Sequence, residues 1–140
     1  MTIFVDANIL IAVLNKEYPL FSSAAKVLSL ADREGFTLCT SPVCVAIAFY
    51  FSAKKSGEQL AKKKIELLLK HLSITTIDEA CTKQAIANKK VVDVEDGIQY
   101  YSALKFGIDY LITDDTDDFY YSTKPVMQAP DFLKTVIGGH

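Results

Sequence analysis

The chain has 140 residues and a mass of 15.5 kDa, which is room for one ordinary domain with one hydrophobic core. Half of the residues are hydrophobic and 23% are charged, a composition that excludes a disordered chain. The formal net charge of −2 argues against indiscriminate binding of nucleic acid, which a basic surface favours. The longest apolar stretch, residues 43–51, is roughly half of the ~20 residues that span a bilayer, and no basic region precedes the first apolar run. We therefore expect a soluble, cytoplasmic protein that does not contact a membrane.

The amino-terminal part of the chain predicts one strand followed by two helices. Residues 2–5 are β-branched or aromatic and end at Asp6, a pattern typical of a short buried strand. Apolar residues at helical spacing begin after Asn8. They return over residues 21–34, where Gly35 is suited to end the helix.

A second strand and an unusually apolar helix follow. Residues 36–40 predict the strand. Ser41 and Pro42 are typical of a helix start, because serine caps the first free N–H groups and proline has no N–H to lose there. The helix over residues 42–53 is apolar on nearly all sides, so we expect it in the core or in a subunit interface.

The rest of the chain continues this alternation. It predicts helices over residues 57–71, 79–89 and 95–106, strands over 73–77, 109–113 and 125–128, and a last helix from about Asp131. Strands separated by helices indicate βαβ units, whose right-handed crossovers place helices on both faces of a parallel sheet. We therefore predict a single domain over residues 1–140 of the α/β class, a three-layer α/β/α sandwich around a parallel sheet of four to five strands.

Acidic residues stand where two of the predicted strands end. Asp6 directly follows the first strand, and Asp114 and Asp115 follow the fourth. Glu95 and Asp96 begin the helix that leads into the fourth strand. Because ligand sites form at the carboxyl ends of parallel strands, we predict that these acids converge at one edge of the sheet.

Converging carboxylates repel each other unless a cation or shifted pKa values relieve the repulsion. No lysine or arginine is a close sequence neighbour of Asp6, Asp96 or Asp115. Ligands that are all oxygen atoms suit Mg²⁺ or Mn²⁺, and such ions support phosphodiester hydrolysis. The pattern favours a metal-dependent phosphodiesterase.

The same acids also fit structural roles. Asp6 is placed to cap the helix that follows it. Asp93 is placed as an N-cap three residues before Asp96, where any acid gains from the helix dipole. The acids of residues 114–118 fit a solvated loop, and for Asp78 we predict a purely structural role.

Four segments of the chain resemble the PIN domain family and, within it, the VapC-type toxin ribonucleases of bacterial toxin–antitoxin pairs. They are residues 5–10, 40–42, 95–104 and 110–119, in this order and over nearly the whole chain. The resemblance implies a ribonuclease that depends on Mg²⁺ or Mn²⁺, forms a homodimer, acts on RNA and is silenced by an antitoxin protein.

The family's metal-holding, catalytic acids fall on Asp6, Asp96 and Asp115, with Asp118 as an additional metal-holding acid. Positions that orient these acids in the family fall on Asn8 and Thr113, and Glu95 is predicted as a further supporting residue. The family's glutamate on the third helix falls instead on Ile47, and no acid occurs between Gly35 and Gly57. One carboxylate of the usual four is therefore missing.

Two further groups of residues have two interpretations each. Four lysines are predicted to guide the RNA backbone or to form a solvated helix face: Lys54, Lys55, Lys62 and Lys63. Five aromatic residues near the predicted edge suit either core packing or base stacking: Tyr100, Tyr101, Phe119, Tyr120 and Tyr121. The cysteines Cys39, Cys44 and Cys81 lack the spacing of a zinc site and are predicted to be buried and reduced.

Other functions remain open beside the nuclease. A degenerate, non-catalytic PIN domain that binds RNA or a protein is favoured by Ile47. An aspartyl-phosphate phosphatase would need an acid two residues after Asp6, where Asn8 stands. A phosphoacceptor receiver domain would need a lysine after a late strand, where Asp114 follows Thr113.

Overall fold

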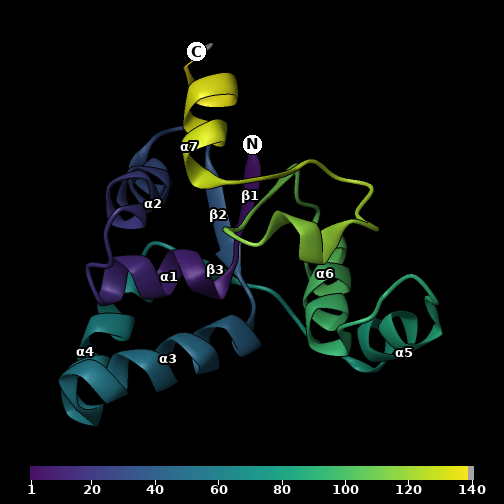
Figure 1. Ribbon diagram of the computed structural model, residues 1–140, viewed down its shortest axis with the longest axis horizontal. Coiled ribbons are helices and arrows are strands. Elements are labelled where there is room, and N and C mark those ends of the chain that lie inside the picture. The colour runs from purple at the N-terminus through teal and green to yellow at the C-terminus, as the bar shows by residue number, and fades with distance from the viewer. Residues whose placement is uncertain (139–140) are drawn as a thin grey trace.

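A parallel sheet forms the centre of the protein, which a computed structural model describes over residues 1–138 (Figure 1). Its strands are β1 (Thr2–Val5), β2 (Thr37–Thr40), β3 (Ser73–Ile74), β4 (Tyr110–Ile112) and β5 (Val126–Met127). The five strands lie in the order β3-β2-β1-β4-β5, and every neighbouring pair is parallel. The strand that begins the chain is therefore central, and its Ile3, Phe4 and Val5 are fully buried.

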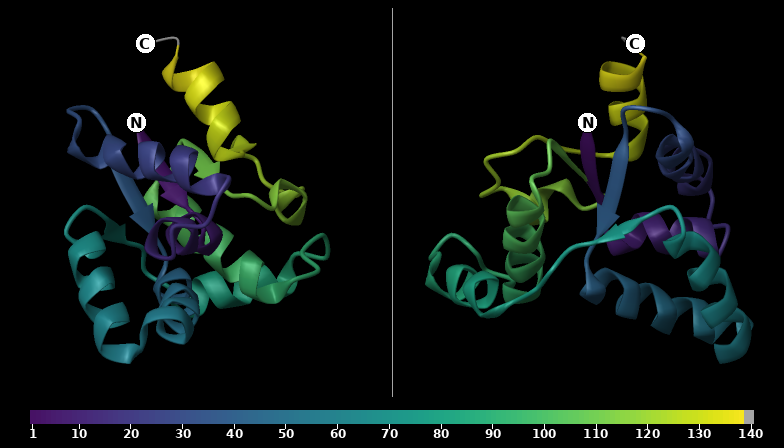
Figure 2. Two further views of the ribbon diagram at one scale, coloured as in Figure 1. Left: turned by 60° about the vertical axis from the view of Figure 1, so that its left-hand side comes forward. Right: turned by 180° about the vertical axis from the view of Figure 1, so that it is seen from behind.

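Helices cover both faces of the sheet. They are α1 (Ala7–Leu14), α2 (Leu20–Ser29), α3 (Pro42–Ser56), α4 (Glu58–Leu69), α5 (Glu79–Ala87), α6 (Val94–Phe106) and α7 (Ala129–Phe132). Figures 1 and 2 show α1 to α4 on one side of the strands and α5 with α6 on the other. This is the predicted three-layer α/β/α sandwich. Within residues 1–138, no helix has the length and the apolar character needed to cross a membrane.

Side-chain caps fix where the helices begin. Ser41 accepts a hydrogen bond from the Cys44 amide at 3.0 Å and starts α3, as predicted. Asp93 accepts from the Asp96 amide at 3.3 Å and starts α6. Helix α3 begins directly after the carboxyl end of β2. The charge of Asp6, at the carboxyl end of β1, acts on Asp96 in the first turn of α6, so both helices begin near the same edge of the sheet.

Some predicted elements end earlier in the structure. The helix predicted over residues 21–34 ends at Ser29 and continues as a single 3₁₀ turn, Leu30–Asp32. The strand predicted over residues 73–77 ends at Ile74 because Ser102 draws the chain toward α6 by donating to Thr75 Oγ1 at 2.6 Å. The last helix begins at Ala129, before the expected start, and a π-helical turn, Leu133–Ile137, follows it.

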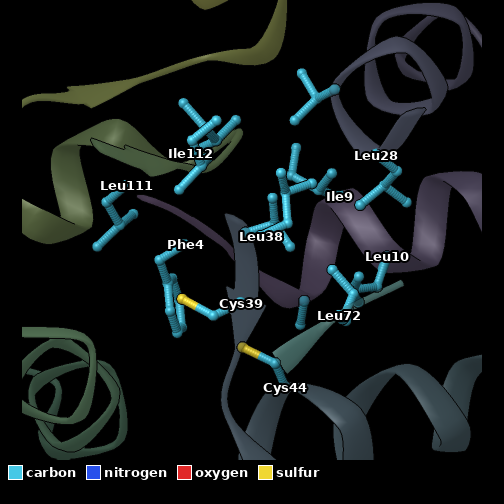
Figure 3. Packing of buried hydrophobic residues seen from close by; sticks show 14 of the residues in the cluster. Phe4, Ile9, Leu10, Leu28, Leu38, Cys39, Cys44, Leu72, Leu111 and Ile112 are labelled. Atoms are coloured by element: carbon cyan, nitrogen blue, oxygen red, sulfur yellow. The ribbon is translucent and has the colours of Figure 1, made fainter. Parts of the chain in front are cut away.

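The hydrophobic core lies between the sheet and its helices (Figure 3). All three cysteines are buried and unpaired, which confirms that prediction. The apolar helix α3 buries only the stripe formed by Cys44, Ala48 and Ser52. Tyr50 and Phe51 on the same helix remain 55% and 44% exposed, so α3 is not a core helix on all sides.

Candidate active site

Asp6 lies at the centre of the predicted edge and has two roles. Its carboxylate accepts from the amide of Ala7 at 2.7 Å, so it caps α1. Its other oxygen accepts from the hydroxyl of Thr113 at 2.8 Å, which ties the end of β1 to the end of β4. Burial raises the pKa of Asp6 above its ordinary value, although these hydrogen bonds oppose the shift. Asp6 can therefore cap α1 and belong to the candidate active site at the same time.

Asn8 and Thr113 connect Asp6 to Asp115. The Asn8 amide donates to Thr113 Oγ1 at 3.1 Å and to Asp115 Oδ2 at 3.3 Å. The same threonine oxygen accepts from the backbone amide of Asp115 at 3.1 Å. In return, Asn8 Oδ1 accepts from the amide of Asp114 at 3.1 Å. The two polar side chains thus hold the loop after β4 against the start of α1, and they place Asp115 beside Asp6.

Asp96 approaches the edge from the first turn of α6. Its carboxyl group is half-buried, and its pKa is raised to about 7. Burial is the main cause, followed by the negative charges of Asp93, Asp6, Asp118 and Glu95. The influence of Asp6 and Asp118 on Asp96 shows that acids from three separate segments crowd one region. Within residues 1–138, Asp96 forms no ion pair with a lysine, arginine or histidine.

The remaining predicted acids are exposed around this group. Asp118 lies on the 3₁₀ turn η2 (Thr116–Phe119), which is held by a hydrogen bond from its own amide to the Asp115 carbonyl at 3.1 Å. Glu95 and Asp114 are also exposed. Within residues 1–138, no three His, Cys, Asp or Glu side chains stand close enough together to hold one ion jointly.

The donor chemistry of these residues fits a hard divalent cation. Every candidate ligand is a carboxylate, and the crowding that raises the pKa of Asp96 is the kind that a cation relieves. Their spacing excludes a closed cage of three direct carboxylate ligands. Mg²⁺ commonly keeps several waters and is bound through one or two carboxylates, so the residues suit an open, partly hydrated ion.

A neutral polar network occupies the side of the site that faces α3. The Cys44 thiol contacts Asp6 Oδ1 at 3.6 Å and also approaches Gln99 Oε1. The same Gln99 oxygen accepts from Ser41 Oγ at 2.9 Å. Burial and the charge of Asp6 raise the pKa of Cys44 to about 12, so the thiol keeps its proton as a donor. Ile47 stands one turn further along α3 and is partly buried.

Gln99 and Cys44 were not among the predicted site residues. A sequence signal for Gln99 existed, because it stands three residues after Asp96 and so shares a face of α6 with it. Cys44 carried no such signal, since it was indistinguishable from a small apolar core residue. Together they fill the space between α3, α6 and Asp6 without adding a charge.

The four predicted RNA-binding lysines lie elsewhere. Lys54 stands over the ring of Tyr50 at 4.8 Å, and Lys55 donates to the carbonyl of Asn15. Lys62 and Lys63 are exposed on α4. With a rise of about 1.5 Å per residue, Lys54 is roughly 18 Å along the axis of α3 from its start at the sheet edge. The fold therefore does not bring these lysines to the acids, and their role in RNA binding stays a prediction.

The profile of a known family, described as PIN domain, matches residues 2–117. The chain belongs to the PIN domain family.

Three solved structures share the fold. A chain of VapBC2 from Rickettsia felis, bound to a DNA fragment from its promoter, has a TM-score of 0.68 and 17% identity, with 91% of this chain and 98% of that one covered. VapC20 from Mycobacterium tuberculosis, described as a toxin that cleaves the sarcin–ricin loop, has a TM-score of 0.61 and 16% identity, with 78% of this chain and 86% of that one covered.

A chain of FitAB bound to IR36 DNA has a TM-score of 0.63 and 17% identity, covering 91% of this chain and 94% of that one. No curated protein matches this chain. At such low identities, the solved structures establish the PIN fold and leave the activity to be argued from the site.

Proposed function

We propose that this PIN domain is a divalent-metal-dependent endoribonuclease, a hydrolase that acts in the cytoplasm on RNA. The observation that carries this proposal is the convergence of acids from separate segments: Thr113 and Asn8 tie Asp6 to Asp115, and the charges of Asp6 and Asp118 act on Asp96. An uncompensated cluster of this kind costs stability, and its retention is accounted for by binding of a cation.

The roles of the residues follow from their contacts. Asp6, Asp96 and Asp115 would hold a partly hydrated Mg²⁺ or Mn²⁺, one or two of them directly and the rest through water, with Asp118 as a further acid. The ion, when bound, supplies activation of water and stabilisation of the negative charge that develops during phosphodiester hydrolysis. Thr113 and Asn8 keep Asp6 and Asp115 in place through their hydrogen bonds. Glu95 adds negative charge at the mouth of the site.

The first test is thermal stability with and without metal. Millimolar Mn²⁺ or Mg²⁺ should raise the melting temperature of the wild type, because a ligand that binds only the folded state stabilises it. Asp6→Asn should remove that response and cleavage of RNA while leaving the metal-free protein at least as stable, because asparagine also caps helices. Asp78→Asn is the matched control, since Asp78 caps α5 outside the site. A variant Asp6→Asn that unfolds without metal would mean that Asp6 is a structural cap only.

We also propose that the protein is the toxin of a toxin–antitoxin pair. Support comes from the PIN fold that it shares with VapC20 and with chains of the VapBC2 and FitAB assemblies. Co-expression with the product of the adjacent reading frame tests this proposal. An antitoxin should co-purify with the chain and suppress its cleavage of RNA, and a neighbouring product that does neither would contradict it.

A homodimer through α3 is proposed from the exposure of that helix. Tyr50 and Phe51 are aromatic and exposed, although Val45, Ile47 and Phe49 of the same helix are partly buried against the core. Covering such a surface in a partner is favourable. Phe51→Glu should convert a dimer into a soluble monomer in light scattering, whereas Lys63→Glu on the neighbouring helix should not. A monomeric wild type at tens of micromolar would overturn this proposal.

A non-catalytic PIN domain that binds RNA or a protein is the second candidate. The network of Ser41, Cys44 and Gln99 favours it, because α3 brings no negative charge to the site. Retained binding of RNA without cleavage at any concentration of Mn²⁺ would decide for this candidate.

A further inference from the structure

Two loops beside the acidic site carry exposed lysines and an exposed tyrosine. The loop between α5 and α6 contains Lys89 and Lys90, and the loop before β5 contains Lys124. Tyr120 lies at the start of the second loop and is 60% exposed. We call these four residues the lysine–tyrosine rim. Within residues 1–138, no lysine of the rim forms an ion pair, so their charges are available to a ligand.

Two neighbouring tyrosines of α6 anchor both loops to that helix. The hydroxyl of Tyr100 accepts from the amide of Thr123 at 2.8 Å, which anchors the second loop. The hydroxyl of Tyr101 accepts from the Asn88 side chain at 3.0 Å, and Asn88 in turn accepts from the amide of Lys90 at 3.0 Å. The rim is therefore built on hydrogen bonds and is not a chance gathering of surface residues.

The two loops also contact each other directly. The hydroxyl of Tyr120 donates to the carbonyl of Lys90. The ring of Tyr120 meets that of Tyr121 at 5.3 Å, and Tyr121 meets Tyr100 at 5.1 Å. These contacts hold the Tyr120 ring in one orientation while more than half of its surface stays open to solvent.

The rim adjoins the acids. Tyr100 follows Asp96 by one helical turn, a rise of about 6 Å along α6. The charges of Asp96 and Asp93 act on Tyr121, which packs against Tyr120. In contrast, α3 and α4 with their lysines lie on the other side of the sheet (Figures 1 and 2). The rim therefore supplies lysines on the same side of the sheet as α6, which carries Asp96.

We propose that the rim is the entry surface for single-stranded RNA, an inference that rests on the proposed function. Tyr120 stacks on a base of the strand, and Lys90 and Lys124 hold the phosphates on either side of it. An exposed aromatic ring flanked by lysines is the arrangement that recognises single strands without regard to sequence. A chain with a net charge of −2 needs such local cations, because its overall field repels RNA.

Binding of a labelled single-stranded RNA, measured by fluorescence anisotropy with a chelator present, tests the rim without cleavage. Tyr120→Ala should weaken binding roughly tenfold, whereas Tyr120→Phe, which keeps the ring and its contact with Tyr121 but loses the hydroxyl bond to Lys90, should lose far less. The double variant Lys90→Gln with Lys124→Gln should lower the slope of log Kd against log salt concentration by about 1.4. The matched control is Lys62→Gln with Lys63→Gln, which removes the same charge from α4.

The outcomes separate this inference from the proposed function. Unchanged binding by the rim variants, or an equal loss in the control, would overturn the rim even if the wild type cleaves RNA. If the wild type binds RNA but never cleaves it, and the rim variants lose binding, the rim is supported and the proposed nuclease activity is rejected. A wild type that neither binds nor cleaves RNA would overturn both. Melting curves of each variant exclude unfolding as the cause of a loss.

Discussion

Helices α5 and α6 pack against each other, and each begins at an aspartate that caps its first turn. At α5, Asp78 forms an ion pair with Lys105, and this hydrogen bond holds its pKa well below the ordinary range. At α6, the capping Asp93 stands beside Asp96, neither acid forms an ion pair within residues 1–138, and the charges of further acids act on Asp96. The pKa of Asp96 is therefore raised to about 7.

The comparison teaches what distinguishes a structural acid from a candidate functional one. Both helices gain the same cap and the same favourable interaction with the helix dipole. The difference is a counter-charge, which the fold supplies to Asp78 and withholds from Asp96. A ligand of positive charge is thus expected only at α6.

The largest expected effect is loss of cleavage when an acid of α6 is neutralised. Asp96→Asn should lower kcat/KM for RNA at least roughly a hundredfold, which corresponds to about 2.7 kcal/mol of barrier. The reason is that one of the few carboxylates that would hold the cation, directly or through water, is removed. Asp78→Asn, measured in parallel, should leave kcat/KM unchanged. Equal losses in both variants would mean that the two helix starts do not differ in function.

Adding an acid on α3 should have the opposite effect. Ile47 stands three residues after Cys44, whose sulfur contacts Asp6, so both residues share the face of α3 that meets the site. Ile47→Glu should tighten binding of Mn²⁺ and raise cleavage about tenfold or more, which is about 1.4 kcal/mol for each tenfold. Ile47→Gln, similar in size but uncharged, should gain far less.

The outcome against this prediction is loss of stability alone. Ile47 packs partly against the core, and a glutamate that points inward would be a buried, unpaired charge. A lowered melting temperature without tighter metal binding would show that position 47 does not face the acids.

The stability of the metal-free protein should depend on pH through Asp96. Since its pKa is about 7 when folded and ordinarily 3.8, the folded chain holds a proton between these values that the unfolded chain releases. The contribution of this proton to the free energy of unfolding is therefore complete below about pH 4, and it is lost as the pH rises through 7. Asp96→Asn should flatten this decline and gain on the order of 1–2 kcal/mol at pH 8, after allowance for screening of a half-exposed group. Urea unfolding across this pH range measures it, and saturating Mn²⁺ should suppress the decline in the wild type.

The smallest expected effect is at the other helix start. Lys105→Met removes the partner of Asp78, but the Lys105 side chain is 55% exposed and that of Asp78 is 32% exposed, so the melting temperature should fall only slightly. Cleavage should not change. A large loss of activity in this variant would show that α5 contributes to the site after all.

The sequence alone predicted most of the architecture because its signals are local. The spacing of apolar residues, the capping residues and the turn residues predicted β1, α3 and α6 with nearly correct bounds. The alternation of strands and helices predicted a parallel sheet. The placement of Asp6 and Asp115 at one edge followed from the same logic, because both residues end neighbouring parallel strands.

Only the tertiary structure determined the contacts between distant segments. The hydrogen bonds from Asn8 and Thr113 to the acids join residues more than a hundred positions apart, and no local pattern specifies them. The same holds for Gln99 and Cys44, which fill the α3 side of the site, and for the contact between Tyr120 and Lys90. Hydrogen bonding and the pKa of Asp96 depend on three-dimensional distance and burial, whereas periodicity reports only which face of an element is apolar.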